Sequence, residues 1–225
     1  FITVRDRFTI FCDRSIPALD MPNALAYEVE DRRQPGRALY ALICKPEMQP
    51  RISTMRFLKG NELANVLHMV DWGVAEWPPA NRKCVIIIYE RPLGGRFMDN
   101  LAGTADRIPD HQLPKQIIKP IQEALIELGN AGVTHRAIRP DNLYFMDEER
   151  NRIVLGDCVT TVPAYDQPVA LETIESGMCD PAGRGTGGSA DDMYSFGVTL
   201  LMMILGRNPL AGQTDDFVIN KKIKE

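Results

Sequence analysis

A ten-residue stretch, 133–142, carries the residues whose types and spacing could do chemistry; it reads V-T-H-R-A-I-R-P-D-N. Gly132 ends the helical pattern before it, and Pro140 stops a helix from continuing, so the stretch is predicted to be a loop. Two short apolar runs with a charged turn between them separate Asn142 from Asp157. That pattern is typical of a hairpin, which would bring the two side chains together. Oxygen ligands of this kind suit Mg²⁺, which usually shares them with phosphate.

This stretch resembles the catalytic loop of the protein-kinase superfamily, H-R-D-x-x-x-x-N, which is followed by a D-F-G metal site. His135, Arg136 and Asn142 match with the spacing kept, and the D-F-G triplet is represented by Asp157 alone. The position of the catalytic aspartate holds Ala137. The resemblance implies a kinase-like fold that has lost its general base, which is a pseudokinase. It also implies that Asn142 and Asp157 are the residues that would hold Mg²⁺.

The segments before this loop read as a small sheet. Alternating apolar runs at 2–12, 24–30 and 38–44 predict three antiparallel strands joined by turns. The third run ends at Lys45 and loosely resembles the kinase V-A-I-K strand, so the resemblance implies that Lys45 contacts nucleotide phosphates.

Two parts of the kinase pattern are absent here. A kinase has G-x-G-x-x-G between its first two strands, whereas residues 13–23 contain no glycine, two prolines and two acidic residues. Nucleotide, if bound, would not be held in the usual way. The helix expected within 51–67 is broken at Gly60 and Asn61, and it has no acid near 53–55 to pair with Lys45.

Strands are expected at 70–74 and 84–89, followed by a hinge at Glu90–Gly95 with Gly94-Gly95 as its flexible point. The resemblance implies that backbone groups near Glu90 meet the adenine of a nucleotide. A simple interdomain turn explains these residues equally well.

The rest of the chain is expected to be mainly helical. A short helix is expected at 96–101 and a long one at 111–130, where apolar residues recur near a 3.6 period. Residues 158–188 correspond to a kinase activation segment, whose final A-P-E is matched to 180–182 without its Glu. The nearly all-apolar run to Leu210 resembles the kinase D-x-W-S-x-G helix, and the Asp192 at its start can accept backbone N–H bonds from the catalytic loop.

The predicted fold class is therefore α+β, with a bilobal kinase-like arrangement. Residues 1–90 are expected to form a β-rich N-lobe with one helix, 91–95 a hinge, and 96–225 a helical C-lobe. The resemblance makes that lobe look truncated after the Asp192–Leu210 helix and suggests a piece of a longer polypeptide.

Composition restricts the classes of partner. The chain has 225 residues and a formal net charge of −4, with a sequence pI of about 5.5, which argues against a generic nucleic-acid binder. No apolar run of membrane-spanning length is present. The five cysteines are odd in number and lack CxxC spacing, which suggests reduced thiols and a cytoplasmic setting.

Three functions follow from the resemblance. The first is a catalytically impaired pseudokinase that serves as a regulatory or protein-binding scaffold, with ATP and Mg²⁺ binding weak or absent. Its partner would be another protein or a flanking domain of the same polypeptide. The second is a divergent but active phosphoryl or nucleotidyl transferase that uses Asp141 or Asp157 differently. The third is a structural module that binds no nucleotide.

Overall fold

The computed structural model describes residues 1–224, and these form two compact units. The first unit contains Phe1–Leu63, Leu67–Pro92 and Val159–Val162. The second contains Ala64–Val66, Leu93–Cys158 and Pro163 to the C-terminal end. The chain passes between the units within the expected hinge, after Pro92.

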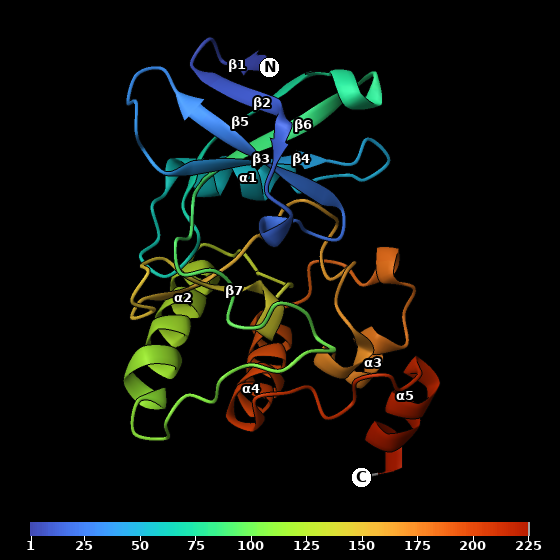
Figure 1. The fold of residues 1–225 in the computed structure, drawn as a ribbon. Coiled ribbons are helices and arrows are strands. Elements are labelled where there is room, and N and C mark those ends of the chain that lie inside the picture. The colour runs from blue at the N-terminus through green and yellow to red at the C-terminus, as the bar shows by residue number, and fades with distance from the viewer. Residues whose placement is uncertain (225) are drawn as a thin grey trace. The chain divides into compact units, whose positions relative to one another are not determined.

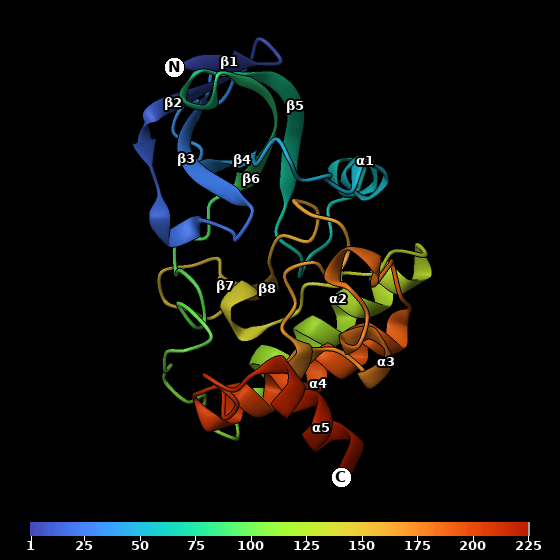
Figure 2. The same cartoon turned by 90° about the vertical axis from the view of Figure 1, so that its right-hand side faces the viewer.

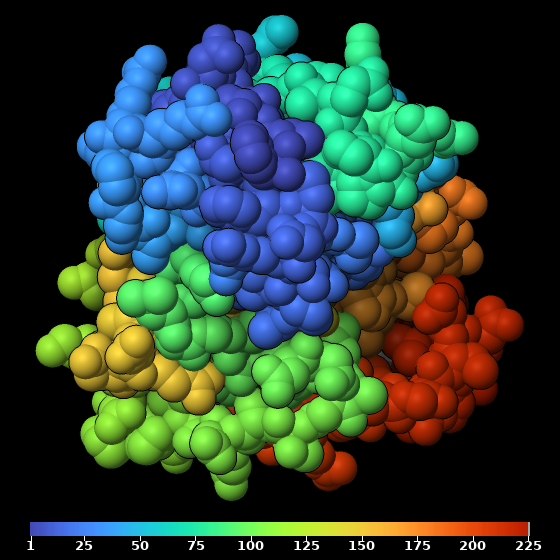
Figure 3. All heavy atoms as spheres, turned by 45° about the horizontal axis from the view of Figure 1, so that its top comes forward, coloured from blue at the N-terminus to red at the C-terminus, as the bar shows by residue number. Residues whose placement is uncertain are grey.

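The first unit is an antiparallel sheet with one helix, α1 (Ile52–Gly60) (Figure 1). Its strand order is β1-β2-β3-β4-β6-β5, so the sheet is built almost entirely from hairpin neighbours. On the face that Figure 3 shows, β1 and β2 (dark blue) form part of the surface of this unit. The strands are β1 (Ile2–Val4), β2 (Phe8–Ser15), β3 (Ala24–Asp31), β4 (Leu39–Cys44), β5 (Met69–Trp77) and β6 (Arg82–Glu90).

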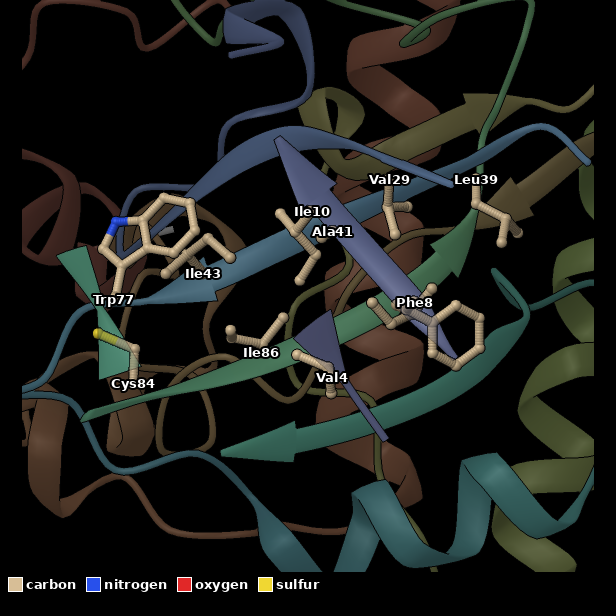
Figure 4. Close-up of a cluster of buried hydrophobic side chains, with 11 residues drawn as sticks. Val4, Phe8, Ile10, Val29, Leu39, Ala41, Ile43, Trp77, Cys84 and Ile86 are labelled. Carbon is tan, nitrogen blue, oxygen red and sulfur yellow. The ribbon is translucent and has the colours of Figure 1, made fainter. Parts of the chain in front are cut away.

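A hydrophobic core lies on one face of these strands (Figure 4). Alternate residues of β4, namely Leu39, Ala41 and Ile43, enter this core because successive side chains of a strand point to opposite faces. Figure 4 shows Trp77 and Cys84 at one end of the cluster. The β-branched and aromatic residues of these strands suit such a half-buried sheet.

The second unit is mainly helical (Figure 2). It contains the hairpin β7 (Leu143–Phe145) and β8 (Ile153–Leu155), as the sequence predicts. A short π-helix at Pro114–Ile118 continues into α2 (Lys119–Asn130). The remaining helices are α3 (Ile174–Gly177), α4 (Ser189–Leu205) and α5 (Asp215–Lys224).

Three expectations about local structure were wrong. The run at 2–12 is two strands, because a tight turn with positive φ at Arg5 and Asp6 interrupts it. Residues 96–101 are not helical, since the Phe97 N–H donates to the Leu143 carbonyl beside the hairpin. By contrast, the helix expected within 51–67 is present as α1 and ends at Gly60, where the sequence predicts its break.

The third wrong expectation concerns the apolar helix of the second unit. It ends at Leu205, well before Leu210, because Gly206 adopts φ +67° and caps it. α5 then follows within the same unit.

Candidate functional site

The loop at 133–142 is held by a carboxylate from α4. Asp192 is 3% exposed, and its two oxygens accept the backbone N–H groups of His135 at 2.7 Å and Arg136 at 2.8 Å. Arg136 has φ +61°, a left-handed conformation that costs energy for a residue with a side chain. The two hydrogen bonds offset that cost, and this is the role that the sequence assigned to the Asp at the helix start.

His135 is a structural residue of this loop. Its side chain is fully buried, and its Nδ1 accepts the Ala137 N–H at 3.2 Å. Its Nε2 therefore carries the proton and donates to the Gly156 carbonyl at 3.0 Å. The imidazole thus ties the loop to the residue that precedes Asp157.

Asn142 and Asp157 are brought together, as the hairpin pattern predicts. The Asn142 amide Nδ2 donates to the carbonyl oxygens of Ala137 and Asp157, both at 2.8 Å. These two acceptors identify which end of the amide is nitrogen. The Asn142 Oδ1 is buried and has no hydrogen-bond partner among the described residues.

The orphaned Oδ1 allows a test of the predicted Mg²⁺ ligands. An amide oxygen beside a carboxylate residue is the right donor chemistry for Mg²⁺. However, Asn142 has no exposed surface, and a Cβ built on Gly156 would lie 2.1 Å from its Oδ1. The oxygen therefore occupies the space left by the absent side chain of Gly156, and as arranged it does not fit an ion. Among the described residues, no group of three or more His, Cys, Asp or Glu could hold a metal.

Asp157 shares its electrostatic environment with a buried tyrosine, Tyr144. Tyr144 is 1% exposed, and burial raises the pKa of its hydroxyl. The positive charge of Arg96 lowers this pKa, and the negative charge of Asp157 raises it further. Asp157 itself is 3% exposed. A buried phenol stays neutral here, so Tyr144 contributes packing and not a charge to this region.

The loop at 133–142 contains a single acidic residue, Asp141. Ala137 stands where the kinase pattern has its aspartate, and the next acid along the loop is Asp141. The Arg139 Nε donates to the Asp141 Oδ1 at 2.9 Å, in a pair whose side chains are 3% and 18% exposed. Asp141 is thus engaged in an ion pair within the loop.

In the first unit, Lys45 follows β4 and is exposed. Its Nζ donates to the Pro22 carbonyl at 2.8 Å, and α1 contains no acidic residue that could pair with it. Lys45 thus stabilises the β2–β3 connection through this hydrogen bond. The sequence did not indicate this role.

The β2–β3 connection uses its backbone donors internally. A 3₁₀ turn at Pro17–Leu19 replaces the glycine loop, and the N–H groups of Leu19, Asp20 and Met21 donate to carbonyls of the same connection or the start of β3. The Asp20 carboxylate accepts the Ala26 N–H at 2.7 Å. Such a segment presents few free amides to a phosphate, in keeping with the sequence analysis.

The predicted hinge is tightly hydrogen-bonded on both sides of the unit boundary. Glu90 pairs with Arg37 at 2.6 Å, and its N–H donates to the His68 carbonyl within the first unit. The Gly94 N–H donates to the Phe145 carbonyl in the second unit. A Cβ on Gly94 would lie 2.3 Å from the Asp147 carbonyl oxygen, so this glycine allows close packing and is not the flexible point that we expected.

The sequence analysis missed Glu172. Its carboxylate lies 3.0 Å from the Arg136 guanidinium, and both side chains are almost fully buried. The Ser176 hydroxyl lies between them, within hydrogen-bond reach of both. Ala170-Leu171-Glu172 keeps the Ala and the Glu of A-P-E, so it matches this motif better than residues 180–182 do. The expectation that the motif lacks its Glu was therefore wrong. The signal was present in the sequence.

The Ala170–Glu172 segment packs on α4 and α5. Val169, Ala170 and Leu171 form a small core with Met202 and Val218. From α5, the Lys222 Nζ donates to the Val169 carbonyl at 2.7 Å and to the Glu172 carbonyl. The segment is therefore fixed from two helices.

No family model matches the sequence. The chain is 26% identical over 163 residues to MAP kinase-activated protein kinase 2 of Mus musculus, which covers 67% of this chain and 40% of that protein. It is 22% identical over 211 residues to calcium/calmodulin-dependent protein kinase type 1 of Caenorhabditis briggsae, which covers 83% of this chain and 52% of that one. The chain thus spans about half or less of the length of these relatives.

Among solved structures, a crystal structure of Rad53 1-466 in complex with AMP-PNP matches with a TM-score of 0.73 and 19% identity. The match covers 95% of this chain and 52% of that one. None of the described helices is long and apolar enough to cross a membrane. The chain has the protein-kinase fold, with an antiparallel sheet in one unit and helices in the other, and the curated proteins that it resembles are protein kinases.

Proposed function

We propose that this chain is a catalytically impaired kinase-fold domain, a pseudokinase that acts as a regulatory or protein-binding scaffold. The observation that carries this proposal is the absence of a usable base in the 133–142 loop. Ala137 occupies its position, and Asp141 is held by Arg139. Phosphoryl transfer depends on positioning, charge stabilisation and a group that accepts the hydroxyl proton. Loss of a positioned base lowers the rate by roughly 10²–10⁴-fold.

Nucleotide binding is proposed to be weak at most. Its candidate residues are Lys45 and Glu90 in the first unit, and Asn142 and Asp157 in the second. Lys45 is engaged with Pro22, and Asn142 would have to turn its amide to offer its oxygen to Mg²⁺. Each of these rearrangements costs free energy and would therefore weaken the binding of a nucleotide.

A scaffold role is supported by apolar side chains on the helices of the second unit. Leu201 and Leu205 of α4 are 53% and 41% exposed, and Phe217 and Ile223 of α5 are 43% and 57% exposed. Figure 3 shows the α5 region (red) on the surface of this unit. Exposed apolar surface of this kind marks protein-contact regions when it gathers on neighbouring elements. The partner proposed is another protein or a flanking domain.

The alternative is a divergent but active ATP-dependent phosphoryl or nucleotidyl transferase that uses Asp141 or Asp157. The Arg139–Asp141 pair weighs against Asp141, since its protonation would break a partly buried ion pair. Asp157 has the position of a metal ligand in the kinase pattern, and a base role would remove it from that task.

A melting experiment tests the nucleotide part of the proposal. The melting temperature is measured with and without millimolar ATP and Mg²⁺, for the natural chain and for Lys45→Ala. A ligand at 100 times its dissociation constant stabilises the folded state by about 2.7 kcal/mol, which is readily visible. We expect a much smaller shift, little changed by the substitution. A large shift that requires Mg²⁺ and disappears in Lys45→Ala would overturn this part of the proposal.

A further inference from the structure

A cavity of about 490 Å³ lies between the C-terminal half of α2 and the N-terminus of α4, entirely within the second unit. The two helices contact one another, and their ribbons are drawn in the lower part of Figures 1 and 2. Its apolar wall consists of Leu125, Ile126, Val133 and Met193. Ile126 and Met193 remain 55% and 49% exposed, although they stand on opposite helices of the cavity.

The cavity is open because its lining includes glycines where side chains would project. Gly129 of α2 and Gly188 at the start of α4 both line it, and a Cβ built on either meets nothing within 4 Å. A volume of this size falls within the range of about 300–1,000 Å³ that is usual for small-molecule sites.

The lining contains one charged residue among those described. This is Asp192, and each of its oxygens already accepts a backbone N–H group, from His135 and from Arg136. The uncommitted polar groups are the amides of Gln122 and Asn130 and the hydroxyl of Ser189. The described lining has no cationic side chain that could pair with an anionic ligand, whereas an apolar body with one or two hydrogen-bonding groups matches the wall and the rim.

We propose that this cavity binds an uncharged small molecule with an apolar body. Such a ligand rests against the turn of α4 that carries Asp192, and Asp192 holds the backbone of the 133–142 loop. Occupancy of the cavity is thereby linked to the order of that loop. This inference does not depend on the proposed scaffold function.

The test uses the 225-residue chain with ¹³C-labelled methionine methyl groups, and indole as a neutral probe. The Met193 methyl resonance should shift and saturate as indole is added, while that of Met178, 64% exposed elsewhere in the unit, should stay in place. Indole-3-carboxylate, an anion of similar shape, should bind at least about tenfold more weakly, which corresponds to about 1.4 kcal/mol. A non-saturating shift, or equal shifts at both methionines, would overturn the proposal.

Two matched pairs of variants localise the site. Gly129→Leu should fill the cavity and abolish the saturable shift, whereas Gly197→Leu, at a glycine of α4 outside the lining that is equally open, should preserve it. If Gly129→Leu does not fold, Ile126→Lys replaces it, with Leu201→Lys as its control of similar exposure. Binding that survives in the cavity variants would contradict the assignment.

Discussion

The Arg136 guanidinium and the Glu172 carboxylate form an ion pair of 3.0 Å whose side chains are only 1% and 0% exposed. It joins the 133–142 loop to a residue that follows Arg136 by 36 positions. Two charges buried this deeply stabilise one another only while both are present, because removal of either leaves an uncompensated charge.

Glu172→Gln is therefore expected to destabilise the chain by about 3 kcal/mol, the order found when one partner of a buried pair is removed. Urea unfolding at neutral pH measures the change. Glu175→Gln, at an exposed residue of α3, is the matched control and should change the free energy of unfolding by less than about 0.5 kcal/mol. Equal changes in the free energy of unfolding for the two substitutions would show that the buried ion pair does not stabilise the fold.

Gly156→Ala is expected to destabilise the chain by about 1–3 kcal/mol through overpacking. The new Cβ would stand 2.1 Å from the Asn142 Oδ1 and 2.5 Å from a ring carbon of Tyr144. Gly129→Ala is the control, because nothing lies within 4 Å of its Cβ and alanine favours a helix. In thermal unfolding, the melting temperature of Gly156→Ala should fall and that of Gly129→Ala should rise. A neutral Gly156→Ala would mean that the Asn142 amide readily turns away, which would favour the Mg²⁺ site.

The stability of the first unit should depend on pH through Asp31. Its side chain pairs with Arg7 at 2.5 Å, and this hydrogen bond is the main cause that lowers the Asp31 pKa from 3.8 to about 2. Because the folded state favours the ionised Asp31 carboxylate, this residue stabilises the fold fully above pH 4, the ordinary pKa of an aspartate. The stabilisation is lost as the pH falls toward 2, where the folded chain also takes up the proton. From the size of the shift this contribution is about 2 kcal/mol.

Asp31→Asn is the corresponding variant. Its free energy of unfolding should lie below that of the natural chain at pH 7, and the difference should shrink as the pH approaches 2. Urea titrations at several pH values give this comparison, with Glu30→Gln at the exposed neighbour as a control. A difference that is constant with pH would rule out the ionised pair as its source.

Lys222→Ala should loosen the Val169–Glu172 segment, because its Nζ bonds the carbonyl oxygens at both ends. Faster hydrogen exchange of the amides at 169–173, with little change in β7 and β8, is the expected result. Lys224→Ala, on the same helix, should leave these amides unchanged. Unaltered exchange in Lys222→Ala would mean that the small apolar core alone fixes the segment.

The order of elements was predictable from the sequence because each carries a local signal. The hairpin of β7 and β8 follows from two apolar runs around a charged turn, and α2 follows from its apolar period. The apolar pattern of 2–12 did not reveal that this run forms two strands. The turn between them has Arg5 and Asp6 at positive φ and contains no glycine that would mark it.

The site was harder to predict, because its contacts join distant residues. Ala137, Asn142 and Asp157 could be placed from their spacing, as could the contact of Asp192 with the loop. The partners of Lys45 and Arg136, the Pro22 carbonyl and Glu172, depend on which loop packs against which strand or helix. Nothing in the local sequence encodes which groups pair, although the A-L-E pattern at 170–172 marks Glu172 itself.

Phosphate transfer is the measurement that tests the central claim most directly. The chain is incubated with radiolabelled ATP and Mg²⁺, and label in the chain, in added protein acceptors and in released phosphate is compared with that of Asp157→Asn. The account predicts that the natural chain is indistinguishable from this variant. Transfer that the natural chain supports and Asp157→Asn loses would contradict it, and would identify an active transferase.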